Sequence, residues 1–342
     1  SEIVNDLYWL IEKYSVNGLI KNLSSYKLME RVLSEQCIVT EGKVELKPSK
    51  EVSSDSIQNP SDIDAGYDGH KGQGYQVQLA ETYTIKNEQA EDELKQEVLN
   101  LITYVKVESA DNHDSDALIH ALEQMEARAV KPEEILVDGA YGGDDNVNDS
   151  KDQAVTVVSP VIGKKSGKDF SAYIFNEKTS EVSLCPNGKS PMSISRNKNG
   201  IFTAKWLKSE CMDCPLKDNC QTKVGSNKRR LIYTEKEIRL WQRRQYESSN
   251  EFKDKYRYRS GIEATNSRFI HMTGARRVAY RGLENVEFAE TMKALGINMF
   301  RITKYVRNLG KINDQIANFD LNKVIFSIFL TCEQEIRVKK IN

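Results

Sequence analysis

The sequence predicts a mixed α/β fold flanked by helices, with a small β-rich insertion that contains cysteines. Residues 75–84 alternate between apolar and polar side chains, as a half-buried strand does. Residues 135–137 form a short apolar run typical of a buried strand, and helical periodicity occurs toward both ends of the chain. Because 342 residues exceed an ordinary single core, we expect two domains, or one large domain with an insertion.

The first forty residues are expected to form amphipathic helices. Their apolar positions recur at intervals of three and four residues: Ile3, Leu7, Leu10, Ile11 and Tyr14, then Leu28, Val32 and Leu33. A polar stretch at residues 41–60 and a glycine-punctuated turn at residues 68–74 follow. The turn precedes the first predicted strand.

The next elements lead to an acidic residue at the end of a strand. We expect a second strand at residues 101–107 and a helix at residues 116–129. Pro132 then breaks the chain before the apolar run at 135–137, which ends at Asp138. Active sites of sheet proteins tend to lie at the carboxyl ends of buried strands, so Asp138 is a candidate site residue.

Residues 151–235 have a different character and predict the β-rich insertion. They contain short apolar pieces separated by lysine, glycine, asparagine and serine, at residues 155–161, 173–175, 201–206 and 230–233. Helical periodicity returns from Glu235, and a further helix is expected from Leu283 to about Val306. The apolar run Val324–Leu330 is far shorter than the ~20 residues of a membrane helix and is expected to be a core strand or helix. No membrane partner is expected.

The formal net charge of −1 conceals a strong asymmetry along the chain. Residues 1–150 hold 13 Lys+Arg and 30 Asp+Glu, a balance of −17, whereas residues 151–342 hold 36 and 20, a balance of +16. A basic half can contact phosphates, and an acidic half can supply carboxylates to a metal ion. Two ordinary solvated surfaces would account for the same asymmetry.

Acidic residues on distant segments suggest a metal site. Asp62 or Asp64 lies beside a strand, Asp138 follows a strand, and Glu263 lies in a predicted helix. Carboxylate oxygens are the ligands that Mg²⁺ or Mn²⁺ prefers, and two such ions can drive phosphodiester cleavage. The alternative for any single Asp is a solvated loop residue or a helix cap.

Glu263 has neighbours that suit a phosphate. Helical spacing places Tyr256 and Arg259 along the same ridge as Glu263. Arg259 can bind a phosphate in a bidentate manner and Tyr256 can add a hydroxyl contact. The alternative is a Glu–Arg pair on a solvated face, worth ~0.3–0.5 kcal/mol.

These motifs together resemble bacterial insertion-sequence transposases of the DDE type, over residues 1–310. The resemblance rests on Tyr256-x2-Arg259-x3-Glu263, on Asp138-Gly139-Ala140-Tyr141, and on residues 59–65 followed by Gly-His-Lys-Gly and by residues 74–78. It implies a ribonuclease H-like mixed sheet, with two Asp residues on adjacent strands, the Glu on a later helix and an insertion between them. It also implies Asp62, Asp138 and Glu263 as the metal-binding triad, with Asp64 as the alternative first acid.

The chain departs from the family pattern at three places. Related sequences have Asp-Pro-Asp where this chain has Asp62-Ile63-Asp64. The family has a basic residue seven positions after the Glu, where Ile270 stands here, and Arg268 or His271 is the candidate substitute. The family also carries a further helical N-terminal domain, so residues 1–45 are expected to be the remnant of a longer region. The remaining predicted parts are residues 46–160 and 236–342 of the catalytic domain and the insertion at 161–235.

Four cysteines cluster in the insertion as Cys185, Cys211, Cys214 and Cys220. Two thiolates separated by two residues can hold one ion, and two more complete the tetrahedral set of a structural Zn²⁺ site. An iron–sulfur cluster and an empty site of free thiols are the alternatives. Cys37 and Cys332 lie in apolar sequence and are expected to be buried, unreactive thiols.

Basic residues interleaved with aromatics predict contacts with DNA. The candidates are Arg229, Arg230, Arg268, Arg276, Arg277 and Arg281. Solvated helix faces are the alternative. The partners expected from the resemblance are double-stranded transposon ends and target DNA, bound by a homodimer in the bacterial cytoplasm at the nucleoid.

The predicted function is metal-dependent DNA strand cleavage and strand transfer at insertion-sequence ends. The alternative from another class is a catalytically inactive, zinc-stabilised DNA-binding remnant of a transposase. A metal-dependent nuclease unrelated to mobility is the third hypothesis. The first hypothesis requires Asp62 or Asp64, Asp138 and Glu263 to meet closely enough to bind a shared pair of Mg²⁺ ions.

Overall fold

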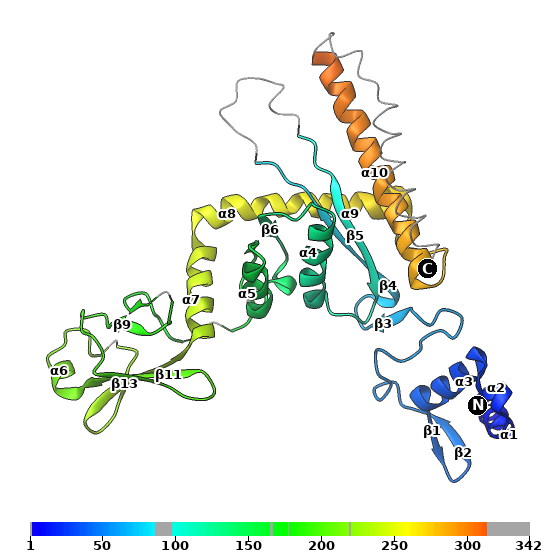
Figure 1. Cartoon of the computed structure of the whole chain (residues 1–342), viewed down its shortest axis with the longest axis horizontal. Coiled ribbons are helices and arrows are strands. Elements are labelled where there is room, and N and C mark those ends of the chain that lie inside the picture. Colours follow the sequence, from blue (N-terminus) through cyan, green and yellow to red (C-terminus); the bar gives the residue numbers. More distant parts are fainter. Residues whose placement is uncertain (1, 86–97, 165–166, 177, 219, 313–342) are drawn as a thin grey trace. The chain divides into compact units, whose positions relative to one another are not determined.

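The computed structural model (Figure 1) describes residues 2–85, 98–164, 167–176, 178–218 and 220–312. The run predicted at Val324–Leu330 and the thiol of Cys332 lie outside these residues. The chain divides into two compact units. Unit 1 consists of Ser1–His113, Gln124–Val130 and Ser260–Asn342, and unit 2 of Asp114–Glu123 and Lys131–Arg259.

Unit 1 begins with three helices and a hairpin: α1 (Glu2–Tyr14), α2 (Gly18–Lys21), α3 (Ser24–Gln36), β1 (Cys37–Thr40) and β2 (Lys43–Leu46). The strand at 37–40 corrects the prediction of helix through residue 40. Its β-branched side chains favour a strand, and Glu41 and Gly42 both have positive φ, as a tight hairpin turn requires. Cys37 is buried beside Val4 and Val44, as predicted for a core thiol.

A three-stranded antiparallel sheet with two helices forms the rest of unit 1. Its strands are β3 (Gly66–Asp68), β4 (Gly72–Glu81) and β5 (Ile102–Ser109), in that order. Helix α9 (Ser260–Thr273) contacts β4, and α10 (Leu283–Ile312) contacts β5. Ile102, Phe269 and Ile297 are buried together between these elements, so apolar burial holds both helices on the sheet.

Polar side chains of α10 also bind the sheet. Asn298 donates to the Ile102 carbonyl at 2.8 Å and accepts from the Ile102 N–H at 2.9 Å. Arg301 forms a 2.9 Å ion pair with Glu81, and both side chains are largely buried. Thr265 of α9 donates to the same Glu81 carboxylate at 2.6 Å. One carboxylate at the end of β4 therefore joins both helices to the sheet.

Unit 2 contains a parallel strand pair, β6 (Glu134–Leu136) and β7 (Thr156–Val158). Helix α4 (Ala117–Ala127) buries Leu118 and Leu122 against Val137 and Val155. A 3₁₀ turn, η3 (Gly139–Tyr141), and α5 (Asp144–Asp152) connect the two strands. The predicted order of helix, strand and acidic residue is confirmed here, although β6 is half-buried and not buried as expected.

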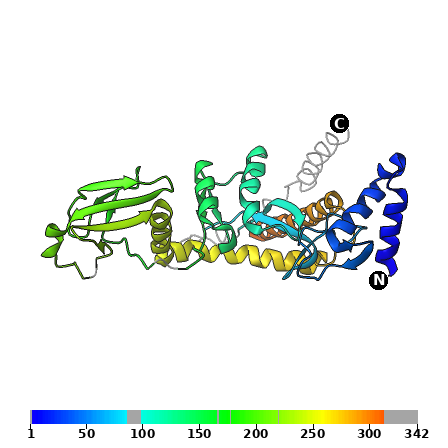
Figure 2. The ribbon, with the colours of Figure 1, turned by 90° about the horizontal axis from the view of Figure 1, so that it is seen from below.

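The segment predicted as the insertion is β-rich. It contains β8 (Ile174–Phe175), β9 (Val182–Leu184), β10 (Ser193–Arg196), β11 (Ile201–Leu207), α6 (Lys208–Met212), β12 (Lys223–Val224) and β13 (Lys228–Thr234). A four-stranded antiparallel sheet has the order β10-β11-β13-β12, and Figure 2 shows its strands side by side in green. Phe170, Phe202, Trp206 and Tyr233 are fully buried on one side of this sheet. Stacked and edge-to-face aromatic pairs therefore form its core.

Helices follow the insertion: α7 (Glu235–Ser248), α8 (Asn250–Tyr256) and the 3₁₀ turn η4 (Arg257–Arg259). Thr234 and Glu237 form a capping box that starts α7. The mixed α/β class is thereby confirmed, while the single ribonuclease H-like sheet stays a prediction. None of the described helices is long and apolar enough to cross a membrane.

Candidate active site

Asp62 and Asp64 lie in a turn just before β3, whereas the resemblance implies that the first acid is on a strand. Asn59 shapes this turn, because its side chain accepts from the Ser61 N–H and its carbonyl accepts from the Asp62 N–H, both at 2.9 Å. Asp62 Oδ1 accepts from the Gly282 N–H at 2.9 Å, and Asp64 Oδ2 accepts from the Leu283 N–H at 2.9 Å. Both carboxylates therefore cap α10, where the helix dipole favours negative charge.

Tyr75 gives Asp62 a second hydrogen bond that Asp64 lacks among the described residues. The Tyr75 hydroxyl donates to Asp62 Oδ1 at 2.5 Å. Burial, the hydrogen bond to Asp62 and the nearby carboxylate charges raise the pKa of Tyr75, so its phenol stays protonated at neutral pH. Asp62 is half-buried and Asp64 is exposed. Asp62 is therefore the more firmly oriented of the two acids.

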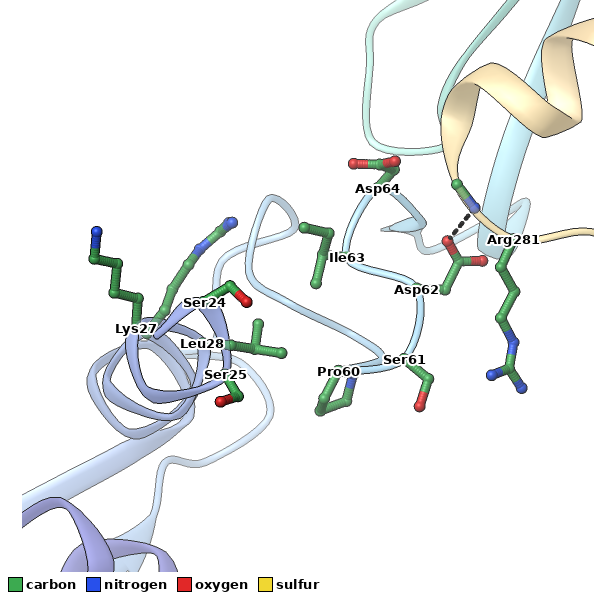
Figure 3. A pocket seen from close by; sticks show the side chains of 12 residues that line it. Ser24, Ser25, Lys27, Leu28, Pro60, Ser61, Asp62, Ile63, Asp64 and Arg281 are labelled. Atoms are coloured by element: carbon green, nitrogen blue, oxygen red, sulfur yellow. Dashed lines mark hydrogen bonds between the residues drawn. The ribbon is translucent and has the colours of Figure 1, made fainter. Parts of the chain in front are cut away.

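An open pocket of about 710 Å³ lies against Asp62 in unit 1 (Figure 3). One wall is α3, which contributes Lys27 and Arg31, and another is the segment that carries Arg281. Glu35 and Gln36, about one turn beyond Arg31 on α3, bond to the backbone of Ile57, five residues before Asp62, at 2.7 and 2.9 Å. Three cationic side chains beside two carboxylates suit a phosphate with bound cations.

Asp138 follows β6, as predicted, and lies in unit 2. Its Oδ1 caps η3 by accepting from the Gly139 N–H. Its Oδ2 forms an ion pair with Arg259 Nη2 at 2.8 Å, and the Arg259 guanidinium lies 5.9 Å from the Tyr256 ring centroid. The structure thus brings together three predicted site residues that are up to 121 positions apart in sequence.

Glu263 lies exposed in the first turn of α9, in unit 1. The predicted ridge of Tyr256, Arg259 and Glu263 on one helix is wrong in detail, since α8 ends at Tyr256 and a 3₁₀ turn separates it from α9. A 3₁₀ turn has three residues per turn, which breaks the α-helical register. The acids of the predicted triad are divided between the units, with Asp62 and Glu263 in unit 1 and Asp138 in unit 2.

The fit to a metal differs between the two predicted sites. Among the described residues, no three Asp, Glu, His or Cys side chains are grouped as one ion requires. Asp62 and Asp138 supply the oxygen ligands that Mg²⁺ prefers, so the donor chemistry fits while the ligand set is not gathered in one unit. Asp62 Oδ2 and Asp64 Oδ1 accept no hydrogen bond within the described part of the chain and remain available to a cation.

Cys185, Cys211, Cys214 and Cys220 are half-buried free thiols. Burial raises the pKa of Cys211, and the charges of Cys220, Cys185 and Cys214 raise it further. Burial opposes ionisation of Cys220, but hydrogen bonds with Thr222 and Tyr173 outweigh it and lower its pKa. Four thiols suit zinc chemically, although they are not arranged here as a ligand set.

The predicted DNA-binding arginines have different surroundings. Arg268, Arg276, Arg277 and Arg281 are exposed in unit 1. Arg229 donates to the Lys217 carbonyl at 2.9 Å, whereas Arg230 is exposed on the next position of β13.

Three residues that shape this region, Lys27, Tyr75 and Glu81, were not predicted from the sequence. Lys27 and Arg31 have the i,i+4 spacing of a basic helix face, and this local signal was available. Glu81 pairs with a residue 220 positions away, and no local pattern predicts that contact.

A carboxylate-rich α/β protein with a basic insertion is the kind of protein that acts on nucleic acid. The family model described as transposase DDE domain matches residues 184–303. This segment is similar to a transposase DDE domain, and the predicted similarity to DDE transposases is confirmed. The family implies DNA binding and a DNA-cleaving and DNA-transferring enzyme. Asp62 and Asp138 lie before the matched segment, and Glu263 and the four cysteines lie within it. No curated protein and no solved structure matches the chain.

Proposed function

We propose that this chain is a catalytically active DDE transposase that cuts and transfers DNA strands at insertion-sequence ends. The observation that carries the proposal is the 2.8 Å ion pair between Asp138 and Arg259. These residues come from two separate motifs, and their contact is worth little as a stabilising surface pair, because Asp138 is 56% exposed. An exposed acid and a guanidinium held together at a strand end are suited to a phosphodiester and its cations.

Each residue has a distinct proposed role. Asp62, Asp138 and Glu263 hold the divalent cations, with Asp62 favoured over Asp64 because Tyr75 and Gly282 orient it. When bound by these residues, Mg²⁺ or Mn²⁺ would supply the charge that activates an attacking water or 3′-hydroxyl and stabilises a leaving oxygen. Arg259 places a fixed positive charge beside Asp138 for the phosphate, and Tyr256 lies against that guanidinium. Transposon ends and target DNA are the substrates, and a homodimer at the bacterial nucleoid is the proposed assembly.

The test is metal-dependent cleavage of supercoiled DNA by the wild type and by Glu263→Gln. We expect nicking by the wild type and a loss of at least ~10³-fold in the variant, because the substitution removes a metal-binding charge but keeps the shape. Glu284→Gln, which changes an exposed acid in the first turn of α10, is the matched control and should cut normally. Binding without cleavage by both wild type and Glu263→Gln would instead support the inactive remnant.

We propose a structural Zn²⁺ bound by Cys185, Cys211, Cys214 and Cys220. The proposal is supported by the sequence spacing of the four cysteines and by the electrostatic influence of the other three thiols on Cys211. Cys214→Ser should remove about one zinc per chain in elemental analysis, whereas Cys37→Ser, which changes a thiol of the N-terminal core, should not. An unchanged zinc content in Cys214→Ser would refute the site, and iron with acid-labile sulfide would indicate a cluster instead.

A further inference from the structure

The four-stranded sheet of the insertion has one buried and one open side. Along β11, Phe202, Ala204 and Trp206 are buried, and Lys205 points to the opposite side between them. Along β13, Leu231 and Tyr233 are buried while Lys228, Arg230 and Ile232 are exposed. Strands β8 and β9 pack on the buried side, because Phe175 and Val182 belong to that core (Figure 1). We call the opposite side the outer face.

The outer face carries a row of like charges. In the antiparallel registers, Lys205 of β11 lies directly opposite Arg230 of β13, which lies directly opposite Lys223 of β12. Ser193 of β10 extends the row beyond Lys205. Like charges on directly opposite residues destabilise a sheet. A polyanion bound along this row would offset the repulsion.

No acidic residue stands on these four strands to neutralise the row. Their residues are Ser193–Arg196, Ile201–Leu207, Lys223–Val224 and Lys228–Thr234. Lys228 adds a fourth cation on the same face, and Thr203 adds a hydroxyl group, while the Ser195 hydroxyl donates to the Thr203 carbonyl at 3.5 Å. The face therefore combines concentrated positive charge with hydrogen-bond donors, which is the composition of a phosphate-backbone surface.

The lack of aromatic side chains on the outer face favours double-stranded over single-stranded nucleic acid. Proteins that bind single strands stack bases on exposed aromatic rings. On these four strands the aromatic residues Phe202, Trp206 and Tyr233 all point into the core. Strands lie ~4.8 Å apart, so the row spans ~10 Å, a length over which a duplex presents several phosphates.

The neighbouring Arg229 has structural contacts and does not belong to the row. It lies on the same side as Leu231 and Tyr233, donates to the Lys217 carbonyl, and interacts with the Cys211 and Cys220 thiols. Arg230, one position later, has no such structural contact among the described residues and faces outward. Of these two adjacent arginines, only Arg230 belongs to the row.

We infer that the outer face of the insertion sheet binds the phosphate backbone of double-stranded DNA through Lys205, Arg230 and Lys223, independently of base sequence. This inference deepens the proposed function by naming a DNA-contacting surface separate from the acidic residues. It requires DNA as the partner but not cleavage. Acidic protein partners fit less well, because protein interfaces are depleted of lysine at their centres.

The test measures binding of the full chain to a random-sequence duplex without divalent metal, over a range of salt concentrations. The triple variant Lys205→Gln/Arg230→Gln/Lys223→Gln should bind at least ~10-fold more weakly at ~0.1 M salt. The slope of log K against log salt should fall by ~2–3, about one for each phosphate that the protein no longer neutralises. Because none of the three residues is buried and the variant relieves like-charge repulsion, thermal unfolding should be unchanged or slightly improved.

The matched control removes the same charge elsewhere in unit 2. Lys178→Gln/Lys189→Gln/Lys217→Gln changes three lysines that are not on the outer face, and it should leave the slope within ~0.5 of the wild type. Equal losses in both triple variants, or no loss in the outer-face variant, would overturn the inference. If the outer-face variant still cleaves DNA at saturating DNA concentration, the proposed function stands. If the wild type binds DNA through the row but never cleaves it, only the proposed function is refuted.

Discussion

The contact between Asp138 and Arg259 orients the two side chains more than it stabilises the fold. Arg259 is 24% exposed and Asp138 is 56% exposed, so the pair stabilises the fold by no more than ~1 kcal/mol. Asp138 is also fixed through the Gly139 N–H at the end of β6. A carboxylate held at two points by a strand end and a guanidinium is pre-organised for the reaction.

Arg259→Lys tests whether the planar guanidinium matters at this position. Lysine keeps the charge but loses the forked geometry, so we expect strand cleavage to fall ~10–100-fold with duplex affinity within ~2-fold. Arg257→Lys, two positions earlier and 5.3 Å from the Tyr258 ring centroid, should retain cleavage. Equal activity of Arg259→Lys and wild type would assign the pair a structural role only.

The raised pKa of Tyr104 predicts a loss of folding stability at alkaline pH. Burial first, then the charge of Glu108, raises the pKa of Tyr104 to about 12, above the ~10 of an unfolded tyrosine. Because the folded pKa is the higher one, this stabilisation is complete below pH ~10 and is lost as pH rises through about 12. Between pH 10 and 12, the contribution of Tyr104 to the free energy of unfolding falls by at most ~1.4 kcal/mol per pH unit.

Urea unfolding at pH 9 and pH 11 measures this effect. Tyr104→Phe should lose less stability than the wild type between the two pH values. Tyr67→Phe, which changes a tyrosine that is 44% exposed on β3, should follow the wild type. Identical pH dependence in all three proteins would show that Tyr104 ionises normally in the folded chain.

At the scale of elements, a single carboxylate connects β4, α9 and α10. Glu81 accepts from Thr265 at 2.6 Å and pairs with Arg301 at 2.9 Å, and the side chains of Glu81 and Arg301 are 8% and 13% exposed. Arg301 also donates to Thr265 and to the Asn100 carbonyl. Because Glu263 lies two residues from Thr265, this network sets the position of the helix that bears the third predicted acid.

Breaking the network should be costly. Arg301→Met leaves the Glu81 charge buried without its partner, so we expect the free energy of unfolding to fall by ~3–5 kcal/mol. The double variant Glu81→Gln/Arg301→Met should lose clearly less than the sum of its single changes, because the unpaired charge is gone. Lys106→Met, which breaks the half-exposed pair with Glu287, should cost less than ~1 kcal/mol. A similar cost for Arg301→Met would show that the network does not hold α9.

Local periodicity predicted most elements because their burial alternates as the pattern requires. The strand expected at 101–107 is β5, and the helix expected at 116–129 is α4, each displaced by one or two residues. The hairpin at residues 37–46 and the 3₁₀ turn at 257–259 were missed, since both depend on packing and turn geometry. Asp138 was predicted from its strand, but the caps that Asp62 and Asp64 provide to α10 come from contacts across about 220 residues, which no local pattern encodes.

At the scale of the whole molecule, the charge asymmetry separates two tasks. The insertion and the helices after it hold most of the cationic residues, while the first 150 residues hold most of the acids. Binding of DNA then depends mainly on Lys and Arg, and cleavage depends on carboxylates and the cations they hold. The two activities should therefore respond differently to removal of metal.

Chelation with EDTA should abolish strand cleavage and leave duplex affinity within ~3-fold. Added Mg²⁺ or Mn²⁺ should restore cleavage to the wild type but not to Asp138→Asn, because the variant lacks a carboxylate for the cation. Ca²⁺ should support binding with little cleavage, since it takes more ligands in a looser geometry. Cleavage that persists after exhaustive chelation would contradict the metal-dependent mechanism. A parallel loss of binding and cleavage would mean that the cation is needed for the DNA-binding surface and not only for the acidic residues.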